Sequence, residues 1–501
     1  MSSAIIARDL SYELPTGRLL FENLNFTLGN HLTALVGPNG VGKTSLAKII
    51  LQEILPKSGF IRCSTELSYL AQREERPSLK VKEFLGLNWD WSMLKEQLLA
   101  SIDQESFCSN LSGGEWMRVR LAKAIDQKFL ILDEPTNDLD QYARKHLINF
   151  LHQHKSGALL ISHDRECLSI CSEFLELSNQ GLSKFSGQWH SYLEYKNSER
   201  NRLKENLDLS TRLREKAVRE RQEKIDKQDK RNRTGKKIAE RGGMPKILIG
   251  ARKRKAQKTT AKIDVQTIEQ LKQNINDAAT AYNKQKIDAV MYADLLSLKI
   301  PNQKLVCEAI NFNILFNTKL YIENLNFVWR GPLRLAIKGK NGCGKSSLIK
   351  VLLGAQYKTQ GELKTGSLQT LYIDQSCSQL NENLSVFENV KEFTGLEDSE
   401  IRNGLAKFLF FKDSVFQPVK DLSGGERLRA LLACGFLNTQ KPELLILDEP
   451  TNNLDLINIE FLENLVAEYQ GALIAISHDD VFLKNCKVTQ EFLIPTNKNF
   501  E

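Results

Sequence analysis

The 501-residue sequence lacks the features of a membrane or secreted protein. It has no run of about 18 consecutive apolar residues, which excludes a membrane-spanning helix. It has no basic start followed by an apolar stretch, which excludes a secretory signal peptide. Its nine cysteines are odd in number and scattered, and no two have the CxxC spacing of a zinc or redox site. Reduced thiols in a soluble, cytoplasmic protein are therefore expected.

Excess basic charge is absent from most of the chain. The net charge is +8, but residues 196–264 hold 24 Lys and Arg against 10 Asp and Glu, a balance of +14. The rest of the chain therefore has a net charge of −6. This distribution assigns any polyanionic partner, such as a nucleic acid, to that one segment.

The chain contains one long stretch twice. LSGGEWMRVRLAKAIDQKFLILDEPTNDLD at 111–140 returns as LSGGERLRALLACGFLNTQKPELLILDEPTNNLD at 422–455, with Ser112 and Ser423 separated by 311 residues. Two copies indicate a duplicated unit. We predict two α/β domains, at 1–195 and 304–501, joined by a linker at 196–303.

A glycine loop precedes each copy, between an apolar strand and a segment with helical spacing. The loops are Gly37, Pro38, Asn39, Gly40, Val41, Gly42, Lys43 and Thr44, and then Gly339, Lys340, Asn341, Gly342, Cys343, Gly344, Lys345 and Ser346. Strand, loop and helix in this order predict a phosphate-binding loop for ATP, because glycines let backbone N–H groups face a triphosphate. Lys43 and Lys345 would reach the outer phosphates, and the Thr44 and Ser346 hydroxyls would bind Mg²⁺.

Acidic residues end the apolar strand of each copy, at the sheet edge where open α/β sheets bind ligands. We expect Asp133 and Asp448 to complete the Mg²⁺ shell, and Glu134 and Glu449 to polarise an attacking water.

A further apolar strand in each half ends in a histidine, His163 or His478, 30 residues after the aspartate. One such histidine is more often a loop residue, but recurrence at the same offset favours a functional role. Gln72 and Gln375 also end matching strands, although their spacing alone assigns them no role.

The linker is predicted to be a helical hairpin. Residues 196–240 have almost no Gly or Pro and read as one exposed helix, with a weak apolar stripe at Leu203, Leu207 and Leu213. Residues 263–298 read as a second helix. Its apolar positions step by 3 and 4, which is a coiled-coil seam: Ile268, Leu271, Ile275, Ala278 and Tyr282.

The turn between these helices, at 241–255, joins an apolar run (Met244 and residues 247–249) to four basic residues at 252–255. Charge runs are usually a solvated face. One-sided charge around exposed apolar residues favours contact with nucleic acid instead.

These motifs resemble the ATP-binding cassette superfamily over nearly the whole chain. LSGGE is similar to its signature motif, ILDEPTN to its second nucleotide motif, and SHD to its switch histidine. Two cassettes, a charged helical linker and no membrane domain resemble the ABC-F subfamily. Glu115 and Glu426 fit this subfamily too, because transporter cassettes more often have Gln there.

The resemblance implies two P-loop cassettes in tandem, joined by a coiled-coil hairpin and closing head to tail within one monomer over two ATP molecules. It gives the two glutamines a catalytic role and places Tyr12 and Phe312 on the adenine rings. One ATP would be held by Lys43, Thr44, Gln72, Asp133, Glu134 and His163, and covered by Ser423, Gly424 and Gly425. The other would be held by Lys345, Ser346, Gln375, Asp448, Glu449 and His478, and covered by Ser112, Gly113 and Gly114.

By the same resemblance, the protein is an ATP hydrolase that binds the ribosome when closed by ATP. Residues 196–264 would contact rRNA, with tRNA as a further candidate, and the tip would approach the peptidyl transferase centre. Such proteins act in translation or in antibiotic resistance. Only 40 residues separate Gln72 from Ser112, against 48 from Gln375 to Ser423, which leaves the first half no room for an arm insertion. This favours the resistance role mildly.

Three alternatives differ in their expected partners. An ATPase subunit of a membrane exporter needs no basic hairpin. DNA-acting cassette ATPases have inserted zinc cysteines or a C-terminal coiled coil, and neither is found in this sequence. A ribosome-recycling cassette protein has an N-terminal iron–sulfur domain, whereas the first cysteine here is Cys63. The second switch region reads SHDD where the first reads SHDR, so one basic contact is in question.

Overall fold

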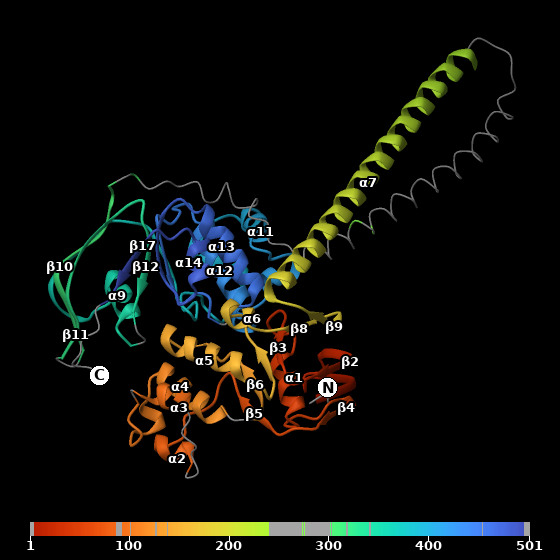
Figure 1. Ribbon diagram of the computed structural model, residues 1–501. Helices are drawn as coiled ribbons and strands as arrows, with labels where there is room; N and C mark the ends of the chain where they lie inside the picture. Colours follow the sequence, from red (N-terminus) through yellow and green to blue (C-terminus); the bar gives the residue numbers. More distant parts are fainter. Residues whose placement is uncertain are drawn as a thin grey trace. The chain divides into compact units, whose positions relative to one another are not determined.

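The computed structural model describes most of both predicted cassettes and the first linker helix (Figure 1). The described residues are 5–86, 93–100, 102–125, 128–137, 139–239, 273, 275, 301, 303–316, 319–339, 342–452 and 454–494. The chain divides into two units, residues 1–190 with 288–501, and residues 191–287. We call 5–190 the first lobe and 303–494 the second lobe. The predicted tip at 241–255 and the second linker helix, apart from Gln273 and Ile275, lie outside the described residues.

The first lobe contains a six-stranded sheet in the order β5-β6-β7-β3-β8-β9 and a three-stranded antiparallel sheet in the order β2-β1-β4. Strand bounds are β1 Ile5–Glu13, β2 Leu19–Leu28, β3 Leu32–Val36, β4 Ser58–Cys63, β5 Leu67–Leu70, β6 Phe129–Asp133, β7 Ala158–Ile161, β8 Glu173–Ser178 and β9 Gly181–Ser186. The central strands β3, β6 and β7 are buried along their whole length. Continuous apolar runs such as FLILD are what a parallel sheet covered on both faces requires.

The second lobe repeats this plan, with a five-stranded parallel sheet in the order β14-β15-β16-β12-β17 and a three-stranded sheet in the order β11-β10-β13. Strand bounds are β10 Leu305–Phe316, β11 Lys319–Arg330, β12 Arg334–Lys338, β13 Lys358–Thr365, β14 Thr370–Ile373, β15 Leu444–Asp448, β16 Ala472–Ile476 and β17 Gln490–Leu493. Because parallel strands end at the same edge, the glycine loop, the acidic pair and the histidine of each lobe lie together.

Helices connect the strands of both lobes. In the first lobe they are α1 Lys43–Ile50, α2 Val81–Leu85, α3 Met93–Leu99, α4 Gly113–Ala124, α5 Gln141–Gln153 and α6 Arg165–Ser169, with the short 3-10 helix η1 Cys108–Asn110. In the second lobe they are α9 Lys345–Leu352, α10 Val386–Thr394, α11 Asp398–Lys407, α12 Gly424–Leu437, α13 Leu456–Glu468 and α14 Asp480–Asn485, with η3 Lys412–Phe416 and η4 Val419–Asp421.

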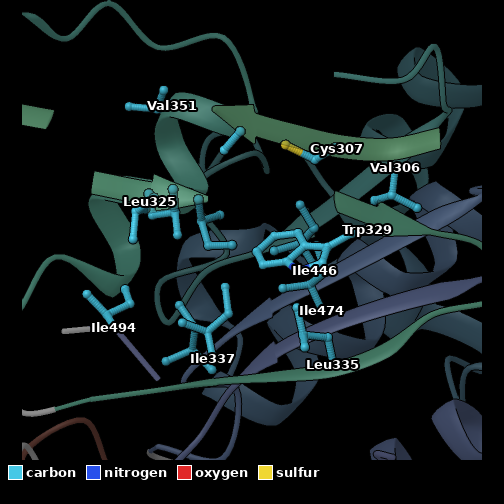
Figure 2. Close-up of a cluster of buried hydrophobic side chains, with 14 of the residues drawn as sticks. Val306, Cys307, Leu325, Trp329, Leu335, Ile337, Val351, Ile446, Ile474 and Ile494 are labelled. Carbon is cyan, nitrogen blue, oxygen red and sulfur yellow. The ribbon is translucent and has the colours of Figure 1, made fainter. Parts of the chain in front are cut away.

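The hydrophobic core of the second lobe joins its two sheets and helix α9 (Figure 2). Trp329 from the antiparallel sheet lies among Leu335, Ile446 and Ile474 of the parallel sheet, and all four are 5% exposed or less. Full burial of side chains of this size contributes about 1.5–3 kcal/mol each. This core holds β12 and α9 firmly on either side of the second glycine loop.

The linker begins as a single helix, α7, that runs from Trp189 to Ala239. Its 51 residues correspond to a length of about 75 Å at 1.5 Å per residue. Leu203 and Leu207 are half-buried, as the predicted stripe requires, but Leu213 is 48% exposed. The predicted stripe is therefore wrong at Leu213, because the helical spacing carries it through Ser210 and Ala217 instead. In the described part of the chain, no helix combines the length and apolarity needed to cross a membrane.

Candidate active site

The first glycine loop wraps around the ammonium group of Lys43. Its Nζ donates to the carbonyl oxygens of Gly37 at 2.6 Å and Pro38 at 3.2 Å, and it lies 3.1 Å from Nε2 of His163. Gly37 has a φ of +148°, and a Cβ there would lie 2.2 Å from the Leu177 carbonyl oxygen. Only glycine fits that position.

The Thr44 hydroxyl is bonded to the first strand-end carboxylate. Its Oγ1 donates to Oδ2 of Asp133 at 2.7 Å, so two hard oxygen ligands lie side by side. Burial raises the pKa of Asp133, and the Thr44 hydrogen bond opposes that rise. No cluster of three or more His, Cys, Asp or Glu side chains suited to a metal occurs among the described residues. Mg²⁺ fits this pair nevertheless, because it takes one or two protein ligands and completes its shell with phosphates and water.

Glu134 and Glu449 have the same unusual backbone conformation. Their φ angles are +50° and +49°, and each backbone N–H donates to the last carbonyl of the neighbouring strand, at 2.8 and 2.9 Å. A non-glycine residue at positive φ carries about 1–3 kcal/mol of strain and is retained mainly at functional sites.

The two histidines lie beside these glutamates. Nε2 of His163 is 3.7 Å from Oε1 of Glu134, and Nε2 of His478 is 3.3 Å from Oε1 of Glu449. Burial raises the pKa of Glu134 to about 8. Burial, with the nearby Lys345 charge, lowers the pKa of His478 to about 4, and the pKa of His163 is lowered well below its ordinary value by burial and Lys43. Both imidazoles are therefore neutral at pH 7.

In the second lobe, the lysine of the glycine loop makes the same contact as in the first, while the tyrosine on the adjacent strand differs in its hydrogen bond. Nζ of Lys345 donates to the Gly339 carbonyl oxygen at 2.8 Å. The Tyr372 hydroxyl donates to Oδ2 of Asp448 at 3.2 Å, whereas the corresponding hydroxyl of Tyr69 has no hydrogen-bond partner in the described part of the first lobe. Lys340 and Asn341, two predicted loop residues, lie outside the described residues.

Each signature motif begins a helix through a capping box. Ser112 accepts from the Glu115 N–H at 3.3 Å while the Glu115 carboxylate accepts from the Ser112 N–H at 2.8 Å. Ser423 and Glu426 form the same pair at 3.4 and 2.9 Å. A glutamate can satisfy the cap N–H, and the glycine N–H groups at the start of α4 and α12 remain open to an anion.

Two cavities lie between the lobes, each lined by both. The first, of about 450 Å³, is lined by eleven of the predicted residues: Asn39, Gly40, Gly42, Lys43, Thr44, Gln72, Asp133, Glu134, His163, Ser423 and Gly424. The second, of about 300 Å³, is lined by Ser112, Gly113, Gly114, Gly342, Gln375, Glu449 and His478, together with Glu134 and His163. Lys345, Ser346 and Asp448 do not line the second cavity, nor does Gly425 line the first.

Tyr12 and Phe312 do not form the predicted pair of adenine-stacking rings. They are 8% and 2% exposed and belong to the two hydrophobic cores. They are not equivalent positions either, because Tyr12 pairs with Phe21 while Phe312 pairs with Leu325. Leu14, two residues beyond Tyr12, lines the first cavity instead.

Four residues outside the predicted site contribute contacts between the lobes: Asp455, Arg144, Arg165 and Glu463. The Asp455 carboxylate accepts from the Asn39 N–H in the first glycine loop at 3.1 Å. Arg144 donates to the His478 carbonyl oxygen at 2.8 Å, and Arg165 pairs with Glu463 at 2.5 Å. The repeated LD after each ILDEPTN stretch was a signal for Asp455. The difference between SHDR and SHDD was a signal for Arg165, whereas Arg144 gave none, because only the folded chain shows its partners.

A comparison with known proteins supports two cassettes in this chain. The ABC transporter family matches residues 21–137 and 322–452, one copy in each lobe. The ATP-binding protein Uup of Buchnera aphidicola subsp. Acyrthosiphon pisum (strain APS) is 30% identical over 481 residues, covering 91% of this chain and 74% of that protein. The chain belongs to the ABC-F subfamily of ATP-binding cassette ATPases.

Two other comparisons extend over more of the chain. The ribosome protection protein VmlR of Bacillus subtilis (strain 168) is 27% identical over 513 residues, covering 100% of this chain and 88% of that protein. The solved structure of an RNase-L inhibitor covers 96% of this chain and 87% of its own, with a TM-score of 0.59 and 16% identity, and supports the fold alone.

Family membership confirms several predictions. This ABC-F protein is an ATP hydrolase with two α/β cassettes in tandem, and such cassettes bind ATP, generally with Mg²⁺. The coiled-coil hairpin stays a prediction, since its second helix lies outside the described residues.

Proposed function

We propose that this ABC-F protein binds the ribosome while ATP holds its two lobes together, and that its linker acts near the peptidyl transferase centre. One observation carries the ATP-dependent part. The cavity in front of Lys43 is also lined by Ser423 and Gly424 of the other lobe. A ligand in that cavity contacts both lobes at once, so it favours the closed state through contacts that the open state lacks.

In this proposal the residues of the first lobe divide the chemistry among them. Lys43 neutralises the outer phosphates, and Glu134 accepts a proton from the attacking water at its Oε1 atom. His163, neutral and hydrogen-bonded at Nε2 to Lys43, orients toward the terminal phosphate. Gln72 lines the same cavity and would position the water. Mg²⁺, held by Thr44 and Asp133 in one lobe and by Ser346 and Asp448 in the other, would screen the phosphate charge.

The signature glycines link the presence of the terminal phosphate to closure of the two lobes. The N–H groups at the start of α12 are free of intrahelical partners and suit an anion. Loss of the terminal phosphate would remove the ligand that both lobes share, and the lobes would then separate. The open start of α4 would serve the second ATP in the same way.

The charge of α7 supports a nucleic-acid partner. Residues 189–239 contain 16 Lys and Arg against 9 Asp and Glu, and basic side chains such as Arg212, Arg214 and Arg219 are exposed. Basic, exposed helices bind nucleic acid through phosphate contacts. Among nucleic-acid partners we choose rRNA, because the relative VmlR is named a ribosome protection protein and aligns with this whole chain. A ribosome partner places the protein in the cytoplasm.

Co-sedimentation with ribosomes tests this function. The Glu134→Gln, Glu449→Gln double variant should hold ATP without turning it over, so it should pellet with ribosomes in ATP but not in ADP. A matched control with Lys43→Met and Lys345→Met should not pellet in either nucleotide. No pelleting of the double variant under any condition would reject the ribosome. Retention on DNA or on membrane vesicles would then favour one of the alternatives.

A charge-reversal series separates rRNA contact from protein contact. Arg212→Glu, Arg214→Glu and Arg219→Glu together should weaken pelleting and reduce its salt dependence. The control changes Glu215, Glu220 and Glu223 to Gln on the same helix, which should leave pelleting as strong or stronger. The resistance role is tested by replacing the tip residues Met244 to Ile249, which lie outside the described residues. That variant should still pellet but should lose protection of translation against antibiotics.

A further inference from the structure

The guanidinium of Arg144 contacts the histidine loops of both lobes. Arg144 lies on α5 and is 7% exposed. Nη1 donates to the carbonyl oxygen of His478 in the second lobe at 2.8 Å, and Nη2 donates to Oδ1 of Asp164 in the first lobe at 2.6 Å. Asp164 directly follows His163. One side chain therefore connects the backbone at one histidine to the residue beside the other.

The residue of the second lobe that is equivalent to Arg144 does not make this contact. Asp140 and Asp455 cap α5 and α13 at equivalent places, so Arg144 corresponds to Ile459. Ile459 is 2% exposed and lines the same cavity as His163, but an alkyl side chain has no donor for the His163 carbonyl. The two ATP sites thus differ in how their histidine loops are fixed.

The two loops also differ in what they would lose with Arg144. The Asp164 carboxylate accepts from the Glu166 and Cys167 N–H groups, at 2.9 and 3.2 Å, and would keep those bonds. The His478 carbonyl would lose a charge-assisted hydrogen bond in a partly buried interface, and such bonds are among the stronger kinds.

We propose that Arg144 is a positioning residue for the second ATP site, which holds the His478 loop so that the imidazole stays beside Glu449. A planar guanidinium fork holds two donor nitrogens apart in a fixed geometry, one toward the carbonyl and one toward the carboxylate, whereas an ammonium is a single point charge on a flexible stem. The position of the first lobe's histidine loop is thereby coupled to the second site through Arg144, and Ile459, at the equivalent position, makes no such contact. The inference rests on the roles that the proposed function gives to Glu134 and Glu449.

Turnover at each site separately tests the inference. In the Glu134→Gln background only the second site turns over, and Arg144→Ile, the residue of the other lobe, should lower kcat about tenfold. That factor corresponds to about 1.4 kcal/mol. KM should stay within about twofold, because the lost contact orients a loop and does not touch ATP. In the Glu449→Gln background, where only the first site works, kcat should fall less than about threefold.

Two further variants control the experiment. Lys145→Ile, at the exposed neighbour of Arg144 on α5, should change neither site. Arg144→Lys keeps a charge beside Asp164, so it should fold with near-normal stability even if Arg144→Ile does not. It should still lower kcat of the second site, because it cannot span both acceptors. Equal losses at both sites, or no loss at the second, would overturn the inference.

Amide hydrogen exchange gives a readout that does not depend on the glutamates. In Arg144→Lys, which keeps a positive charge beside Asp164, residues 477–480 should exchange about tenfold faster than in Lys145→Ile, while residues 162–165 should change little. If neither single Glu→Gln variant lowers turnover, the catalytic assignment fails, and the exchange result alone decides the inference. Unchanged exchange at 477–480 would refute it.

Discussion

Arg165 of the first lobe and Glu463 of the second form a two-point ion pair, with Nη1 2.5 Å from Oε1 and Nη2 3.0 Å from Oε2. Their side chains are 16% and 6% exposed. The position equivalent to Arg165 in the second lobe is Asp480, which accepts from Gln141 of the first lobe at 3.3 Å. The ion pair that Arg165 of SHDR forms is therefore replaced, at Asp480 of SHDD, by a weaker, exposed hydrogen bond with Gln141.

Removing one partner of the Arg165–Glu463 pair should destabilise the protein strongly. Arg165→Met leaves a buried carboxylate without its counter-ion, a change that typically costs about 3–5 kcal/mol. Arg165→Met with Glu463→Leu should recover most of that loss, because no charge is then left unpaired. The control is Lys82→Met, which breaks the exposed pair with Glu105 and should cost about 1 kcal/mol or less. Urea unfolding of these three variants and of the unaltered protein measures each loss. Equal losses in Arg165→Met and Lys82→Met would contradict the expectation.

Replacing both strained glutamates should separate ATP binding from hydrolysis. Glu134→Gln with Glu449→Gln keeps the size of each side chain but removes the proton acceptor, so turnover should fall about 10²–10⁴-fold. ATP binding, followed with a fluorescent analogue, should stay within about twofold because no phosphate contact is lost. Glu75→Gln, at an exposed glutamate near Gln72, is the control and should hydrolyse normally. Near-normal phosphate release from the double variant would remove both glutamates from the reaction.

Much of this site could be predicted because its parts are local. A glycine loop between strand and helix, or a carboxylate at a strand end, depends on a few neighbouring residues and on the parallel sheet that aligns them. The repeat added a check, since each residue had a counterpart in the other half, 302 residues away for Lys43 and 315 residues away for Asp133. Thr44 beside Asp133 and His478 beside Glu449 are the contacts that this reasoning anticipated.

The predicted adenine-facing residues were matched incorrectly between the two lobes. Strands β1 and β10 contain irregular pairings at equivalent places, between Leu10 and Tyr12 and between Phe312 and Ile314, so the two strands share one register. In the resulting register Tyr12 corresponds to Ile314, and Leu14 to Phe316. The partners of Arg144 were hidden for another reason, since His478 is 334 residues away in sequence and belongs to the other lobe.

His478 should make the ATP-free protein lose stability in mild acid. Its native pKa of about 4 lies below the ordinary value of about 6.5, so the unfolded chain takes up a proton first as pH falls. Stability from this group is therefore present above about pH 6.5 and is lost toward pH 4, by about 2 kcal/mol between pH 7 and pH 5. His478→Gln should show that much less loss over the same interval in urea unfolding. Replacement of the exposed His152 by Gln should not reduce the loss of stability. Parallel curves of stability against pH for the unaltered protein, His478→Gln and His152→Gln would rule the effect out.

Adding an aromatic ring at Leu14 should change ATP affinity, whereas removing the ring of Tyr12 should change stability. Leu14→Tyr places a ring at the cavity in front of Lys43, and base–aromatic stacking contributes about 1–3 kcal/mol. ATP affinity of the first site, measured with Lys345→Met to silence the second, should therefore rise about fivefold or more, and more for ATP than for a pyrimidine triphosphate. Tyr12→Leu should leave that affinity unchanged and lower the free energy of unfolding by about 1–2 kcal/mol, because it removes a core ring. A loss of ATP affinity in Tyr12→Leu with unchanged stability would restore Tyr12 as the stacking residue.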